Sequence, residues 1–151
     1  MKFLFYLIIF VSLGFSSTQM SIVSDSFSAD EAKKISIFSG HVKIVKDSDT
    51  ISSNKVIVKF DKNNKPIFYE ANGAVEFSIS LKKSTISGSC ERLTYNPMSK
   101  IYTLGGKVDI LELPSKRKLK ANKVKIDTIN SRTEVSGTKS KPVKFIFNIE
   151  E

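Results

Sequence analysis

A phrase of five residues occurs three times at an even spacing, each time as glycine, any residue, valine, a polar residue and an apolar residue. It reads GHVKI at 40–44, GAVEF at 73–77 and GKVDI at 106–110, so that its glycines lie 33 residues apart. A phrase repeated at a fixed interval is typical of a fold that stacks one structural unit several times. The repeat therefore constrains the fold more than any other feature of the chain.

A second phrase alternates with the first and consists of a small residue, a polar residue, any residue and then apolar-x-apolar. It reads SNKVIV at 53–58, CERLTY at 90–95 and ANKVKI at 121–126, and Ser24-Asp25 begins a shorter copy. A glycine follows the four copies after 16, 20, 16 and 16 residues, at Gly40, Gly73, Gly106 and Gly137. We therefore expect about four strand-turn-strand repeats, with the glycines at strand starts or bulges.

Within each repeat, apolar residues alternate with polar ones. Val75, Phe77, Ile79 and Leu81 are separated by Glu76, Ser78 and Ser80, and similar runs continue as far as Phe145, Phe147 and Ile149. Strict alternation predicts strands with one buried and one solvated face. Turn residues separate the runs at 61–66, 95–100 and 113–118. Short strands at even spacing predict an antiparallel all-β sandwich, barrel or roll.

The first sixteen residues, MKFLFYLIIFVSLGFS, have the layout of a secretory signal peptide. Lys2 precedes an apolar run that ends in small residues. The alternative is an uncleaved membrane anchor, but the run is shorter than the roughly 20 residues that a spanning helix needs. We therefore expect a signal peptide at 1–16, one domain at 17–151 and export from the cytoplasm.

The chain offers little material for catalysis or metal binding. His41 is the single histidine and Cys90 the single cysteine, and neither has a partner residue that the sequence nominates. Both are expected to be ordinary strand residues, His41 on the solvated face. Close carboxylate pairs such as Asp47 and Asp49 lie in apparent turns, where solvated charge is the better interpretation. We expect no enzyme, no cofactor and no metal.

The net charge of +9 indicates an anionic partner or simply a soluble surface. For an exported chain, lipid headgroups, phosphorylated glycolipids or acidic polymers are better candidates than nucleic acid. The basic clusters also serve to protect exposed strand edges from pairing with other chains. These clusters are Lys33-Lys34, Lys82-Lys83, Lys116-Arg117-Lys118 with Lys120, and Lys139 with Lys141 and Lys144.

With both phrases laid out, the chain resembles the OstA-like family, and within it the LptA-type proteins that transport lipopolysaccharide (LPS) across the periplasm. The resemblance covers roughly 20–147 and rests on both strand phrases, in the family's order. The segments that carry it are 20–47, 51–60, 90–110 and 119–127. At the turn position of the second phrase, where the family has Asp, this chain has Asn54, Glu91 and Asn122.

The resemblance implies an antiparallel β-jellyroll that is open at both ends and holds the acyl chains of lipid A in its apolar interior. It places a lipid-contacting strand on Met20 and Ile22 and a groove aromatic on Phe77. By alternation, the further lipid-binding residues are Phe38, Val42, Ile44, Val58, Tyr95, Ile110 and Ile126. For each of these residues, ordinary core packing is the alternative.

The resemblance also implies partners. Family members join end to end, and they join an inner-membrane LptC-like protein and the OstA-type domain of an outer-membrane translocon. The first strands (20–30) and the last (143–149) would be the edges that pair. Three alternatives remain open: a membrane-anchored LptC-like protein, a scaffold module that holds no lipid, and an exported enzyme acting on an anionic glycan.

Overall fold

The computed structural model describes residues 19–150, which form one antiparallel sheet of ten strands. The predicted signal peptide at 1–16 lies outside the described residues. Among residues 19–150, no helix is long and apolar enough to cross a membrane. The strands are β1 (Met20–Val23), β2 (Ser26–Asp30), β3 (Ile35–Lys46), β4 (Asp49–Phe60), β5 (Pro66–Ser80), β6 (Thr85–Asn96), β7 (Ile101–Leu113), β8 (Arg117–Asp127), β9 (Arg132–Ser136) and β10 (Lys144–Ile146).

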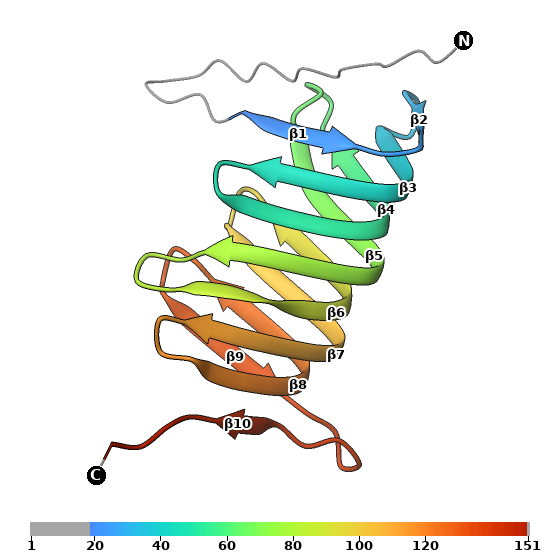
Figure 1. The fold of residues 1–151 in the computed structure, drawn as a ribbon. Coiled ribbons are helices and arrows are strands. Elements are labelled where there is room, and N and C mark those ends of the chain that lie inside the picture. The colour runs from blue at the N-terminus through green and yellow to red at the C-terminus, as the bar shows by residue number, and fades with distance from the viewer. Residues whose placement is uncertain (1–18, 151) are drawn as a thin grey trace.

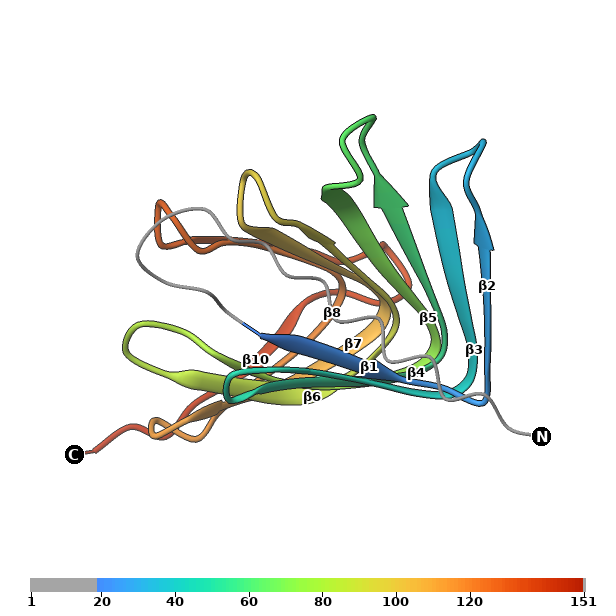
Figure 2. The same cartoon turned by 90° about the horizontal axis from the view of Figure 1, so that it is seen from above.

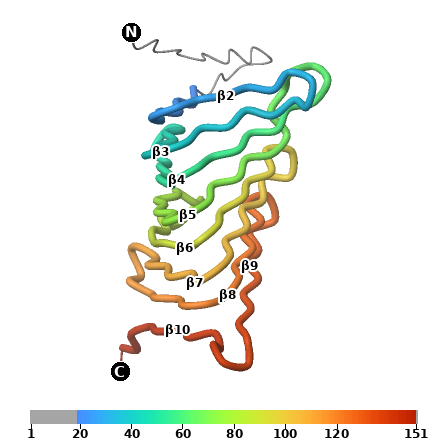
Figure 3. Tube along the Cα trace, turned by 90° about the vertical axis from the view of Figure 1, so that its right-hand side faces the viewer, coloured from blue at the N-terminus to red at the C-terminus, as the bar shows by residue number. Residues whose placement is uncertain are grey.

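The strands follow one another through the sheet in chain order, from β1 and β2 at one end to β9 and β10 at the other (Figures 1 and 3). β1 and β2 both pair with β3, and β9 and β10 both pair with β8. The two terminal pairs therefore leave one free edge at each end of the stack. The predicted all-β antiparallel jellyroll, open at both ends, is confirmed.

Each long strand bends sharply near its middle, so that the sheet folds into two facing walls (Figure 2). The register of the strand pairs assigns each half-strand to one wall. Wall A comprises β1, β10 and the segments 42–46, 49–53, 75–80, 85–89, 108–113 and 117–121; wall B comprises β2, β9 and the segments 35–39, 55–60, 66–72, 92–96, 101–105 and 123–127.

The repeated glycines make the bends. Gly40, Gly73 and Gly106 have φ angles of +80°, +82° and +77°, and the residue after each of them has a φ of +46°. Two residues of the bending strand there stand opposite one residue of its neighbour, which is a β-bulge. Left-handed backbone favours glycine because a Cβ adds steric strain there. The prediction of bulges is confirmed, and the alternative of strand starts is wrong, since the hydrogen-bonded ladder resumes beyond each bend.

The polar residue of the second phrase packs against the glycine of the following strand. A Cβ on Gly40 would lie 2.5 Å from an Asp25 carboxylate oxygen, and a Cβ on Gly73 would lie 2.8 Å from the Asn54 amide nitrogen. The backbone amide of Asp25 also donates to the carbonyl of Gly40 (2.9 Å). The two phrases recur together because each bend needs a residue from both.

The fourth bend is a loop instead of a bulge. Seven residues, 137–143, connect β9 to β10 opposite only two residues of β8. The amide of Thr138 donates to the carbonyl of Lys141 (2.8 Å), which closes a turn inside this loop. Gly137 does not have a positive φ, unlike Gly40, Gly73 and Gly106. The prediction that it repeats the role of Gly40 is therefore wrong, because the inserted residues turn the chain without a left-handed glycine.

The last strand is shorter than the alternation predicts. Phe147 and Ile149 lie beyond β10, because β8 begins at Arg117 and Ile146 already pairs with Lys118. Both residues are exposed, Phe147 at 53% and Ile149 at 74%. The predicted turns agree better, since β5 begins at Pro66, β7 at Ile101 and β8 at Arg117.

Candidate functional site

The apolar interior between the two walls, hereafter the groove, runs along the stack and is largely filled by side chains. Most of the inward side chains are buried, and they form one hydrophobic cluster. Of the predicted lipid-binding residues, eight are at most 9% exposed: Phe38, Val42, Ile44, Val58, Phe77, Tyr95, Ile110 and Ile126. Met20 and Ile22 in β1 are partly buried and pack against that cluster. All ten are therefore on the interior side, as alternation places them.

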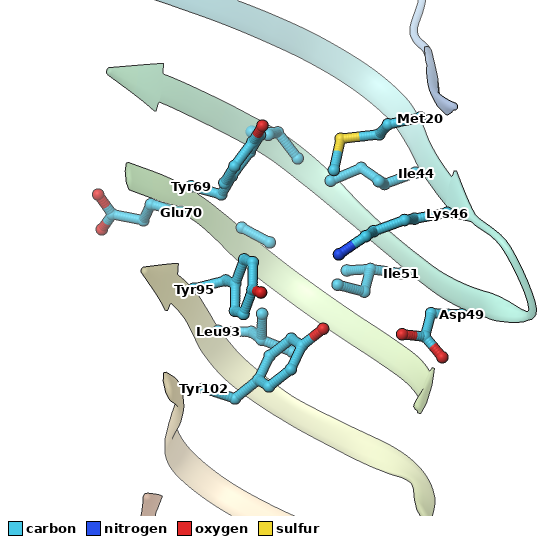
Figure 4. A pocket seen from close by; sticks show the side chains of 12 residues that line it. Met20, Ile44, Lys46, Asp49, Ile51, Tyr69, Glu70, Leu93, Tyr95 and Tyr102 are labelled. Carbon is cyan, nitrogen blue, oxygen red and sulfur yellow. The ribbon is translucent and has the colours of Figure 1, made fainter. Parts of the chain in front are cut away.

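The N-terminal half of the groove is nearly filled by side chains. Met20, Ile44 and Ile51 of wall A face Val56, Leu93 and Tyr95 of wall B around a cavity of only about 30 Å³ (Figure 4). Apolar residues account for most of this lining. The space is too small for an acyl chain unless the walls or side chains move apart.

Three tyrosines line wall B in this half. Tyr69 is in register with Tyr95, and Tyr95 with Tyr102. The Tyr95 and Tyr102 rings stack with their centroids 4.4 Å apart, and the Tyr69 and Tyr95 centroids are 6.3 Å apart. Burial raises the pKa of all three hydroxyls, to about 12 for Tyr69. The hydroxyls therefore stay neutral at physiological pH and present polar tips among apolar rings.

One cation crosses from wall A toward these tyrosines. The Lys46 ammonium lies 5.5 Å from the centre of the Tyr95 ring (Figure 4). Lys46 follows Val42 and Ile44 at the spacing of two that points side chains inward. A charged residue thus occupies a position where alternation predicts an apolar one.

The C-terminal half of the groove holds a larger cavity of about 340 Å³. Ile86, Ile110 and Leu119 line it from wall A, together with Leu81 just beyond the end of β5, and Val124, Ile126 and Val135 line it from wall B. Phe145 of β10 and the polar residues Glu112, Arg117, Lys118 and Thr133 complete the lining. This end of the groove has room for an apolar ligand without rearrangement.

Comparison with protein families decides the identity of this fold. Residues 21–132 match the family model described as LptA/(LptD N-terminal domain) LPS transport protein. The chain belongs to this family. The LptA-type resemblance seen in the sequence is thereby confirmed, and the family is one of transport proteins.

A solved structure shares the fold of this LptA-family chain. It is LptH, described as the LptA-homologous periplasmic component of the lipopolysaccharide transport device from Pseudomonas aeruginosa. The match has a TM-score of 0.75 at 14% sequence identity and covers 86% of this chain and 95% of LptH. At this identity the likeness shows the fold alone. A search among curated proteins gives no match.

In this LptA-family protein the predicted lipid-binding residues divide among three places. Met20, Ile44 and Tyr95 line the N-terminal cavity, and Ile110 and Ile126 line the C-terminal one. The other five lie on the interior side without lining either cavity. Whether any of the ten contacts lipid stays a prediction.

Sequence reasoning missed several lining residues, among them Lys46, Tyr69, Tyr102 and Leu119. Alternation alone could have nominated them, because Lys46 continues the series of Val42 and Ile44. What the sequence did not supply was the register, which sets Tyr69, Tyr95 and Tyr102 side by side across three strands.

His41 and Cys90, the two candidates for catalysis or metal binding, have the surroundings of ordinary strand residues. The His41 side chain is 92% exposed, and its Nδ1 lies 2.7 Å from an Asp25 carboxylate oxygen, which raises the pKa of the imidazole through a hydrogen bond and the charge of the carboxylate. Cys90 is buried, and burial raises the pKa of its thiol to about 11. Within residues 19–150, no three His, Cys, Asp or Glu side chains gather as metal ligands.

Proposed function

We propose that this protein is a periplasmic LPS-binding bridge protein. It shields the acyl chains of lipid A in the groove between walls A and B and passes LPS from the inner to the outer membrane. Residues 1–16 act as a signal peptide that exports residues 17–151 and is then removed. The partners are LptC-like and outer-membrane translocon domains of the same fold, and further copies of this chain.

The apolar groove carries this proposal. Each buried methylene contributes about 0.8 kcal/mol, so that a single acyl chain gains several kcal/mol on leaving water for such a surface. The C-terminal cavity of about 340 Å³ is lined mainly by Leu, Ile, Val and Phe and provides a place for part of a chain. Binding by burial requires neither catalytic groups nor a cofactor. Directional movement would then be driven by an upstream transporter.

The free edges support joining of copies end to end. β1 and β2 run from wall A to wall B, whereas β9 and β10 run from wall B to wall A, so a second copy placed beyond β10 continues the antiparallel order. Charge agrees with this arrangement. Residues 19–31, which contain β1 and β2, hold three acidic residues and no basic one, and residues 132–146, which contain β9 and β10, hold four basic residues and one acidic residue, a net charge of +3. The acidic first edge of one copy complements the basic last edge of another.

Site-specific photocrosslinking tests the proposal. A photoreactive amino acid at Phe77 or Ile126, both on the interior side, should trap LPS in cells and with purified LPS. Lys59, an exposed residue on the outer face of wall B, is the matched control. If all three positions stay free of LPS while the protein is folded and exported, the groove is only a core, and the scaffold alternative replaces this proposal.

Whether residues 1–16 are removed from the mature protein distinguishes a bridge protein from a membrane-anchored LptC-like protein. We expect the mature protein to begin after residue 16 and to be released from cells with the periplasmic fraction. N-terminal sequencing of the purified protein checks this. A chain that retains Met1 or Lys2 and sediments with membranes would contradict the signal peptide and favour the anchored protein.

A further inference from the structure

We propose that Lys46 recognises the phosphate of the bound lipid's headgroup. In the free protein its ammonium lies across the groove over the Tyr95 ring, and on binding it exchanges the ring for a phosphate oxygen. The inference rests on the proposed function, because it assigns a specificity-determining residue to the same groove.

The position of Lys46 at the edge of wall A supports this role. Lys46 is the last residue of β3, at the rim, and pairs with Asp49 across the hairpin turn. Its side chain is directed inward, as that of Ile44 is, and reaches Tyr95 at the rim of wall B. A lipid whose acyl chains lie between the walls would leave its headgroup at this rim, within reach of the ammonium.

The ammonium of Lys46 is available for an anion. It is the only Lys or Arg side chain among the residues that line the N-terminal cavity, and it forms no ion pair within residues 19–150. Neither of the two carboxylates in that lining, Glu70 and Asp49, forms an ion pair with Lys46. Glu70 accepts a hydrogen bond from Arg92 (2.5 Å), and Asp49 accepts one from the backbone amide of Ser80 (2.8 Å).

The contact with Tyr95 is of a kind that a phosphate displaces. A cation over an aromatic face is held only by the ring quadrupole. A lysine bound to a phosphate forms a charge-assisted hydrogen bond, which is considerably stronger. Moving Lys46 off the ring also uncovers the narrow N-terminal cavity, so headgroup binding and entry of an acyl chain favour each other.

The tyrosines add a second observation. The hydroxyls of Tyr69, Tyr95 and Tyr102 have no hydrogen-bond partner in the protein among residues 19–150, although their rings line this cavity. No side-chain oxygen within residues 19–150 is both buried and unpaired, so these hydroxyls reach solvent at the groove mouth and can form hydrogen bonds with a polar ligand there. A phosphorylated sugar headgroup supplies both an anion for Lys46 and hydroxyls for the tyrosines.

Binding of two lipids to the mature protein tests the inference. The probes are bis-phosphorylated lipid A and the same lipid A with its phosphates removed, each in detergent. The variants are Lys46→Gln, Lys46→Arg and, as the matched control on the outer face of the same strand, Lys43→Gln. Urea unfolding verifies that each variant is folded.

We expect wild type, Lys46→Arg and Lys43→Gln to prefer the phosphorylated lipid by about tenfold. Lys46→Gln should lose that preference while it binds dephosphorylated lipid at least as well as wild type does. If Lys46→Gln discriminates as wild type does, the phosphate is recognised elsewhere and the inference is wrong. If wild type binds neither lipid, the proposed function itself fails. If wild type binds both lipids equally well, the proposed function stands and the inference about Lys46 is wrong.

Discussion

Phe145 of β10 lies in register with Leu119 of β8 on the inner face of wall A, yet Phe145 is 51% exposed. Leu119 is partly buried and packs against the core cluster. The difference arises because β8 has neighbours on both sides, whereas β10 is the last strand of the stack. An inward aromatic residue without a covering strand is the feature that a further copy would complete.

Replacing Phe145 with glutamate should weaken end-to-end association. A carboxylate at the junction would lose water without gaining a partner, so we expect at least about a tenfold weaker association. Because Phe145 is half exposed, the free energy of unfolding should change by no more than about 1 kcal/mol. Light scattering behind size exclusion, over a range of protein concentrations, measures the association.

Ile146→Glu is the matched control for Phe145→Glu. Ile146 is the next residue of β10, is 42% exposed and points to the outer face by alternation. The Ile146→Glu variant should associate end to end as strongly as wild type does. Equal association of both variants and wild type would show that the inner face of β10 takes no part in a junction.

The adjacent glycines Gly105 and Gly106 should respond oppositely to alanine. Gly106 has a φ of +77°, and a Cβ there would clash with the Glu91 side chain, so Gly106→Ala should cost about 1–2 kcal/mol. A Cβ on Gly105 would have no atom within 4 Å, and Gly105→Ala should be neutral or stabilise by up to about 1 kcal/mol. Urea unfolding measures both. A loss of similar size for the two variants would argue against the bend at Gly106.

The alternation and the two phrases were sufficient to predict the all-β class, the antiparallel order and the inward side of all ten chosen residues. Local rules succeed there because each repeat contains its own bend, strands and turns. They failed at Gly137, where the same phrase is followed by an insertion, and at Phe147 and Ile149, where the partner strand ends. Register and length depend on a neighbouring strand, and alternation within one segment carries no information about them.

The cavities were even less accessible to sequence reasoning. All four of Ile110, Ile126, Val42 and Phe77 are buried in the core, but only Ile110 and Ile126 also line a cavity. Both kinds of position satisfy the same alternation. They differ in which side chains the neighbouring strands and the facing wall place around them, which is a property of the whole sheet.

Cys90→Ser should be tolerated. The Cys90 Sγ donates to the carbonyl of Arg92 (3.3 Å), and Ser53, at the same position of an earlier repeat, donates to the carbonyl of Lys55 (3.1 Å). A serine hydroxyl at 90 can therefore make the bond already seen at 53, and we expect the free energy of unfolding to change by less than about 1 kcal/mol. A larger loss in urea unfolding would mean that the repeats differ in their backbone at this position.

The same thiol should react slowly with disulfide reagents. Burial raises its pKa to about 11, so that little thiolate exists at pH 8, and the surrounding core excludes the reagent. The rate should rise sharply when urea unfolds the protein. Rapid labelling of the folded protein at pH 8 would be inconsistent with the buried position.

The pair of His41 and Asp25 should make the first bend weakly pH-dependent. The hydrogen bond and the negative charge of Asp25 raise the folded-state pKa of His41 above its ordinary value of 6.5. The folded state therefore favours the protonated imidazole. The resulting stabilisation is fully present below the ordinary pKa and is lost as the pH rises through the raised one. Because both side chains are largely exposed, the effect on stability is small.

An NMR titration of the single histidine measures this pKa directly. We expect a midpoint above 6.5 in wild type and a return toward the ordinary value in Asp25→Asn, which keeps the shape of the side chain and removes its charge. Asp30→Asn, an acidic residue at the far end of β2, is the control and should leave the midpoint unchanged. Should Asp25→Asn titrate with the wild-type midpoint, the two side chains do not form this pair in solution, and the first bend is held by the Gly40 backbone and the Asp25 amide alone.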